Sequence, residues 1–89
     1  MATSSALLFV EDEVFLHDLV EPALADAGFV VAAATRPDEA MALLTQRRAD
    51  FCALVTDVDL GGGPSGWEIA RLARQLIADI PVVYAVPIR

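Results

Sequence analysis

Four short apolar runs divide the chain and limit the folds that it can adopt. They are ALLFV (residues 6–10), FVVAAA (29–34), FCALVT (51–56) and IPVVYAV (80–86). Their length suits β-strands rather than helices, and polar residues, glycine or proline follow each run. Continuous apolar runs of this kind are typical of strands that are buried on both faces, as in a parallel sheet. We therefore expect four buried strands.

The first segment between these runs has a helical pattern. From Val14, apolar side chains recur at spacings of three and four, and Gly28 closes the segment as a glycine after a helix end. The expected apolar stripe comprises Leu16, Leu19, Val20, Ala23, Leu24 and Ala27. Pro22 lies inside this helix and predicts a kink or a local break, because proline lacks a backbone N–H group.

Two further helices are expected along the chain. Thr35 and Asp38 have the spacing of a capping box, with Pro37 in the first turn, so a helix should run from there through Leu44. The residues from Trp67 to Ile77 place their apolar side chains on one helical face. Strands and helices therefore alternate as βαβαβαβ, which predicts an α/β fold with a parallel sheet and right-handed crossovers.

The size and the charge of the chain restrict its partners. The 89 residues suffice for a single domain, residues 1–89, and the net charge is −7, with thirteen acidic and six basic residues. Arg47 and Arg48 form its one basic pair, so direct nucleic-acid binding is not expected. The start of the chain has neither a basic signal-peptide region nor a membrane span, and the lone Cys52 lies in an apolar run, so we expect a cytoplasmic protein without membrane attachment.

Acidic residues follow two of the expected strands. Glu11 and Asp12 come directly after the first run, and Asp57 comes directly after the third. Parallel strands end at one edge of their sheet, so these three carboxylates should lie together, where they would repel one another unless a cation or a proton intervened. Mg²⁺ prefers oxygen ligands and would let a carboxylate accept a phosphoryl group. The alternative is a solvated acidic cluster that merely starts a helix.

The same residues carry a family resemblance. ALLFVEDE before a helix, ALVTDVDL before a glycine-containing loop, GWEIARLAR and IPVVYA occur in the order found in the receiver domains of bacterial response regulators, which the chain resembles from Ala6 to Ala85. The resemblance implies a flavodoxin-like (CheY-like) fold with strand order 2-1-3-4-5. It also implies a phospho-accepting signalling domain of a two-component phosphorelay rather than an enzyme.

The resemblance further implies roles for single residues and for partners. Asp57 would be the phospho-accepting aspartate, Glu11 and Asp12 would organise Mg²⁺, and Asp59 would add a ligand through its backbone carbonyl. A sensor histidine kinase or a phosphotransfer protein would supply the phosphoryl group.

The sequence departs from the family pattern at its carboxyl end. The family's Thr or Ser after the fourth strand corresponds to Val86, which has no hydroxyl group, and the family's Lys after a fifth strand has no counterpart, because the sequence stops before such a strand. We therefore expect an incomplete receiver of four strands and three helices without the last helix-strand-helix, and an impaired or altered output. Its fourth strand would be an apolar sheet edge, which predicts a homo-oligomer formed by strand addition or by exchange of elements.

Three other interpretations stay open at this point. A degenerate receiver would serve only as an interaction or dimerisation module. Asp57-Val58-Asp59 also matches the D-x-D of haloacid-dehalogenase-like phosphohydrolases, although that motif ordinarily follows the first strand. Gly61, Gly63 and Gly66 fit the G-x-G-x-x-G fingerprint, but Asp57 and Asp59 beside them would repel a dinucleotide pyrophosphate.

Overall fold

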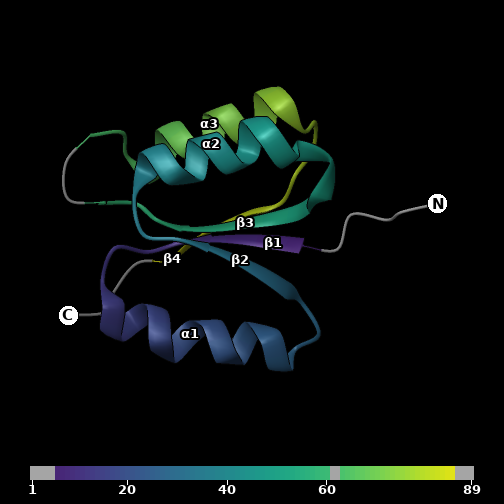
Figure 1. The fold of residues 1–89 in the computed structure, drawn as a ribbon. Helices are drawn as coiled ribbons and strands as arrows, with labels where there is room; N and C mark the ends of the chain where they lie inside the picture. Colours follow the sequence, from purple (N-terminus) through teal and green to yellow (C-terminus); the bar gives the residue numbers. More distant parts are fainter. Residues whose placement is uncertain (1–5, 61–62, 86–89) are drawn as a thin grey trace.

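Four strands and three α-helices alternate along the chain, as the apolar runs predict. The structure is a computed structural model, which describes residues 6–60 and 63–85. Its elements are β1 (Ala6–Val10), α1 (Val14–Asp26), β2 (Val30–Ala34), α2 (Pro37–Arg47), a short 3₁₀-helix η1 (Arg48–Asp50), β3 (Phe51–Asp57), α3 (Gly66–Leu76) and β4 (Val82–Ala85). Figure 1 shows the sheet with α2 and α3 on one face and α1 on the other. The α/β fold class is confirmed.

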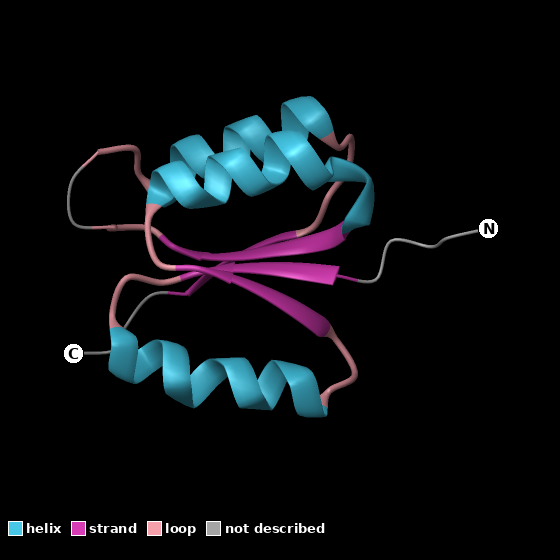
Figure 2. Cartoon of the chain, in the orientation of Figure 1, coloured by secondary structure: helices cyan, strands magenta, loops and turns pink. Residues whose placement is uncertain are grey.

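All four strands are parallel and lie in the order β2-β1-β3-β4. At the carboxyl end of β1, Val10 pairs with Ala34 of β2 and with Thr56 of β3. The neighbouring residue Asp57 pairs with Ala85 of β4. The strands therefore end together at one edge of the sheet, from which loops lead to the three helices (Figure 2).

The main core lies between the sheet and the pair α2 and α3. Its fully buried side chains come from the sheet and from both helices and include Leu8, Leu44, Phe51, Leu54 and Ile69. The outward positions of α3 carry Arg71, Arg74 and Gln75, as its helical pattern predicts. This packing fixes β1 and β3 next to each other at the centre of the sheet.

The structure excludes a break in α1 at Pro22 and corrects the expected apolar stripe. The helix is continuous from Val14 to Asp26, so Pro22 does not split it. Pro22 is exposed, and so is Asp18, whose carbonyl group loses its hydrogen-bond partner and is within reach of water. The expected apolar stripe is also partly wrong, because Leu19 is 63% exposed whereas His17 is only 8% exposed and packs against Phe9, with ring centroids 4.9 Å apart.

The expected capping box before α2 does not form. Arg36 is the N-cap residue and makes no side-chain capping bond. Its guanidinium group instead contacts the Asp38 carboxylate at 2.7 and 3.1 Å, which takes Asp38 away from the helix end. The N–H of Thr35 donates to Oε1 of Glu39 at 3.0 Å, and Pro37 begins the helix as predicted. Among the helices in the described part of the chain, none is long and apolar enough to cross a membrane.

Candidate functional site

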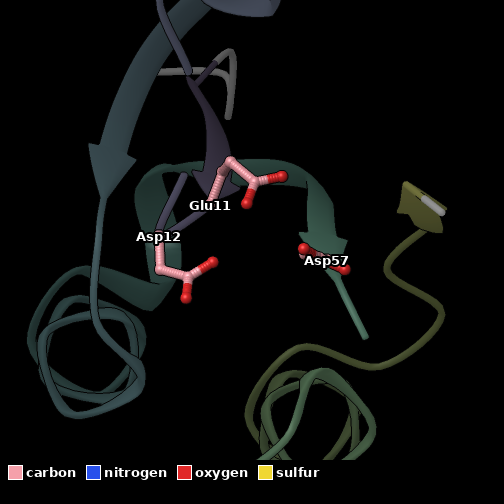
Figure 3. Close-up of side chains that lie close together, drawn as sticks. All are labelled: Glu11, Asp12 and Asp57. Atoms are coloured by element: carbon pink, nitrogen blue, oxygen red, sulfur yellow. The ribbon is translucent and has the colours of Figure 1, made fainter. Parts of the chain in front are cut away.

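Three carboxylates meet at the carboxyl edge of the sheet. Glu11 follows the last residue of β1, Asp12 is the next residue, and Asp57 is the last residue of β3 (Figure 3). Each offers one oxygen atom, and these oxygens all lie within 4.8 Å of one another. The structure thus brings together the three residues that the sequence places at this edge.

Backbone hydrogen bonds hold Glu11 in this position. Its N–H donates to the carbonyl oxygen of Ala34 at 3.0 Å, so Glu11 continues the β1–β2 ladder by one residue. The N–H of Glu13 donates to Oε2 of Glu11 at 3.1 Å. Glu11 is only 2% exposed, which is unusual for a carboxylate that pairs with no basic residue in the described part of the chain.

The turn after β3 fixes Asp57. Asp57 is 7% exposed, and its Oδ1 accepts a hydrogen bond from the N–H of Asp59 at 3.3 Å. The N–H of Gly66, at the start of α3, donates to the Val58 carbonyl at 2.9 Å. A Cβ atom on Gly66 would collide with the backbone carbonyl of Asp57 and would lie 3.0 Å from Cα of Val58. Glycine at this position therefore lets α3 begin directly against the end of β3.

Burial and the neighbouring carboxylates change the pKa of Glu11. Burial is the main cause that raises the pKa of Glu11 from 4.5 to about 7, and the nearby Asp57 charge and hydrogen bonds with Asp12 and Asp57 raise it further. The Glu13 N–H opposes this shift. The site therefore favours a bound proton or a bound cation, the two ways in which close carboxylates escape repulsion.

An open pocket of about 410 Å³ lies beside Asp12. Its lining also includes residues from the loop before α2 and from the loop before α3: Thr35, Arg36, Pro37, Asp38, Leu60, Gly63 and Pro64. The Arg36 hydrogen bonds hold the pKa of the exposed Asp38 carboxyl below its usual value. The sequence motifs did not indicate Arg36 at this site, although its place just after the second apolar run puts it at the same sheet edge as Asp12.

Oxygen donors are what a hard divalent cation requires, and the site supplies them. Glu11, Asp12 and Asp57 could hold Mg²⁺, which coordinates carboxylates and commonly keeps several waters. Asp59 adjoins the cluster through its N–H, and a contribution from its carbonyl stays a prediction. Val86 and Gly61 lie outside the described residues, so the structure tests neither the missing hydroxyl group nor the dinucleotide fingerprint.

Comparison with known proteins points to one family. No protein-family model and no curated protein matches the chain. Among solved structures, a response regulator receiver protein from Sinorhizobium medicae WSM419 is 34% identical over 93% of this chain and 66% of its own, with a TM-score of 0.87. Chemotaxis protein CheY4 from Vibrio cholerae is 26% identical over 90% of this chain and 66% of its own, with a TM-score of 0.77.

A third structure supports the fold alone. A response regulator receiver domain protein from Clostridium thermocellum is 20% identical over 92% of this chain and 64% of its own, with a TM-score of 0.84. The chain thus spans just under two thirds of the length of each of these three structures. The strand order β2-β1-β3-β4 is the order that the family resemblance predicts. The chain is similar to the receiver domains of response regulators and has their CheY-like fold.

Proposed function

We propose that the chain is a two-component receiver that accepts a phosphoryl group on Asp57 with the help of Mg²⁺. The observation that carries this proposal is the convergence of Glu11, Asp12 and Asp57, with oxygens within 4.8 Å, at the carboxyl edge of the sheet. Ligands and chemistry gather at this edge in open α/β sheets. The family, in which receivers are signalling domains, supports the same assignment.

The metal would be held by the three carboxylates and by the backbone carbonyl of Asp59. The raised pKa of Glu11, to about 7, supports a cation site, because the same repulsion that favours a proton favours a divalent ion. Bound Mg²⁺ would neutralise charge on the phosphoryl oxygens while they approach a negatively charged acceptor.

Asp57 would act as the nucleophile. One of its carboxylate oxygens attacks phosphorus in line, the phosphorus–nitrogen bond to a donor histidine breaks, and the imidazole leaves with the bonding electron pair. The N–H of Asp59, 3.3 Å from Oδ1, helps to orient the carboxylate for this attack. The product is an acyl phosphate on Asp57.

The phosphodonor would be a phosphohistidine on a sensor histidine kinase or on a phosphotransfer protein. Such a partner must bring its histidine to the acidic edge, so it must contact the elements that begin there. Phe15, in the first turn of α1, is 73% exposed, and Trp67, the second residue of α3, is 55% exposed. Exposed aromatic side chains on both sides of the acidic edge are suited to a protein partner.

Fluorine NMR with beryllofluoride, which mimics a phosphoryl group, tests this function. With Mg²⁺ present, the wild-type protein should give bound-fluoride signals, and Asp57→Asn should give none. Asp26→Asn is the matched control, because it removes an exposed carboxylate at the far end of α1. Equal signals from Asp57→Asn and the wild type would exclude Asp57 as the acceptor.

A second candidate function is an interaction module without phosphoryl transfer. The observation in its favour is the exposed apolar surface on α1 and β4, where Phe15, Leu19 and Val83 are each more than half exposed. β4 is also an edge strand of the sheet within the described residues. Self-association through β4, or by exchange of elements, therefore stays a proposal, and sedimentation showing a monomer over the micromolar range would count against it.

A further inference from the structure

The pocket beside Asp12 adjoins the acidic site without being part of it. Its volume of about 410 Å³ is that of an ordinary small-ligand site, and its lining includes Asp12 but neither Glu11 nor Asp57. Figure 3 shows Asp12 and Asp57 on opposite sides of Glu11. Seen from Asp57, the pocket therefore begins beyond Asp12, on the far side of the acidic site.

The pocket combines one basic group with apolar walls. Arg36 is the one basic residue among the described residues that line it. The apolar surface comes from both loops that border the pocket and is supplied by Pro37, Leu60 and Pro64. Such a lining suits a small ligand that joins an anionic group to a short apolar chain, because a guanidinium group binds carboxylates and phosphates in paired hydrogen bonds.

Arg36 can exchange its present partner for a ligand. Its guanidinium group contacts the Asp38 carboxylate at 2.7 and 3.1 Å, but the two side chains are 70% and 68% exposed. An ion pair that is this exposed contributes little to stability, because water and salt screen the two charges. An anionic ligand in the pocket can therefore take the place of the Asp38 carboxylate at small cost.

We propose that this pocket binds the acyl group of a small acyl phosphate, with Arg36 on its carboxyl oxygens, so that such molecules donate phosphoryl groups to Asp57. The inference rests on the proposed function of Asp57. A carboxylate oxygen of Asp57 attacks phosphorus, the phosphorus–oxygen bond to the acyl group breaks, and the carboxylate leaves with the bonding electron pair. Because the attack is in line, the leaving group lies on the side of the phosphorus away from Asp57, and the pocket begins on that side.

Arg36 should distinguish phosphodonors by their leaving groups. The carboxylate released from an acyl phosphate is an anion that accepts two hydrogen bonds from a guanidinium group, whereas the imidazole released from a phosphohistidine is neutral. The Arg36 charge therefore stabilises the first leaving group as it forms and gives the second no such help. A merely structural role of Arg36 would instead affect both kinds of donor alike.

Two small phosphodonors with different leaving groups test the inference. Intact-mass spectrometry with Mg²⁺ measures the second-order rate constants of phosphorylation by acetyl phosphate and by phosphoimidazole. The ratio of the first constant to the second should fall about tenfold in Arg36→Gln, because charge-assisted hydrogen bonds to the leaving group are lost. Arg36→Lys should recover part of the ratio, since it keeps the charge without the paired hydrogen bonds. Asp38→Asn should raise the ratio about twofold by freeing Arg36.

The matched control removes the same charge elsewhere. Arg71 is an exposed arginine on α3 and does not line the pocket. Arg71→Gln makes the chain more negative by the same amount as Arg36→Gln, so it reproduces any general repulsion of an anionic donor. The ratio of the two rate constants should stay at the wild-type value in this control. Circular dichroism establishes that each variant is folded.

The outcomes separate this inference from the proposed function. Phosphorylation of the wild-type chain by phosphoimidazole, with the same ratio in Arg36→Gln as in the wild type, would overturn the inference and leave the role of Asp57 intact. Equal losses with both donors would give Arg36 a structural role and would also overturn it. A wild-type chain that neither donor phosphorylates would overturn the proposed function, and the inference with it.

Discussion

Glu11 links the acidic edge to the stability of the fold. Its side chain is 2% exposed, its N–H extends the β1–β2 ladder, and its pKa is raised to about 7. A carboxyl group whose pKa is higher in the folded state binds its proton more tightly there than in the unfolded chain. The favourable contribution is complete below the unfolded pKa and is lost as the pH rises through the folded one. This contribution to stability is therefore lost between pH 4.5 and about pH 7.

The metal-free protein should lose stability across this window. Two and a half pKa units correspond to about 3 kcal/mol in the free energy of unfolding between the two ends of the window. Urea denaturation in EDTA at pH 4.5 and pH 7.5 measures this difference, and Glu11→Gln should remove most of it because the amide does not titrate. Equal pH dependence in the variant and the wild type would show that Glu11 is not the group responsible.

At the residue scale, the sequence predicted where the three carboxylates lie, but it did not predict how nearby side chains pack and pair. Glu11, Asp12 and Asp57 could be placed because each follows an apolar run, and the ends of parallel strands share one edge. Burial of His17 could not be foreseen, because a lone histidine in a helix suits either face. The Arg36 contact with Asp38 was missed because the capping-box spacing offered a competing role for Asp38.

At the element scale, the connection from β3 to α3 determines where Asp57 points. Gly66 lets the first turn of α3 approach the Asp57 backbone, and its N–H donates a hydrogen bond to the Val58 carbonyl oxygen. The sequence predicted the strand and the helix from their patterns, but it gave no sign that Gly66 has a steric role. That requirement arises from the close approach of two backbones, which appears only when the elements are packed.

Gly66→Ala should destabilise the protein by about 2 kcal/mol or more, although alanine is a better helix former than glycine. The cause is the collision of its Cβ with the Asp57 carbonyl. Gly28→Ala is the matched control: its φ is +100°, but no atom lies within 4 Å of the added Cβ. The control should lose about 1 kcal/mol through backbone strain alone. Thermal or urea unfolding compares the two, and a smaller loss for Gly66→Ala would contradict the steric role.

Helix ends were less predictable than helix positions. The three helices lie where the periodic patterns place them, because apolar spacing reflects the buried face directly. The cap of α2 differs, since an arginine side chain beside Asp38 competes with the helix N–H groups for its carboxylate. α1 differs because its outer side also carries the apolar residues Phe15 and Leu19, so spacing alone could not separate its buried face from its exposed face.

At the scale of the whole molecule, charge opposes the proposed self-association, while exposed apolar side chains favour it. Each chain has a net charge of −7, so two chains repel one another. The exposed apolar side chains of α1 and β4, which include Phe15, Leu19 and Val83, cannot form ion pairs. Added salt screens the repulsion, with a Debye length of about 10 Å at 0.1 M and about 3 Å at 1 M.

Dimerisation should therefore strengthen as the salt concentration rises. Sedimentation equilibrium should show a several-fold lower dissociation constant in about 0.5 M NaCl than in about 50 mM NaCl. Val14→Lys lowers the negative charge of the chain at an exposed position on α1, away from the β4 edge, and should make this salt dependence shallower. Weaker association at high salt would instead show that ion pairs hold the dimer.

The central claim is that Asp57 accepts a phosphoryl group in a site organised by Glu11 and Asp12. Intact-mass spectrometry after incubation with Mg²⁺ and millimolar acetyl phosphate tests it most directly. The wild-type chain should gain the mass of one phosphoryl group, and the gain should disappear in EDTA and in Asp57→Asn. An unchanged wild-type mass, or the same gain in Asp57→Asn, would contradict the claim.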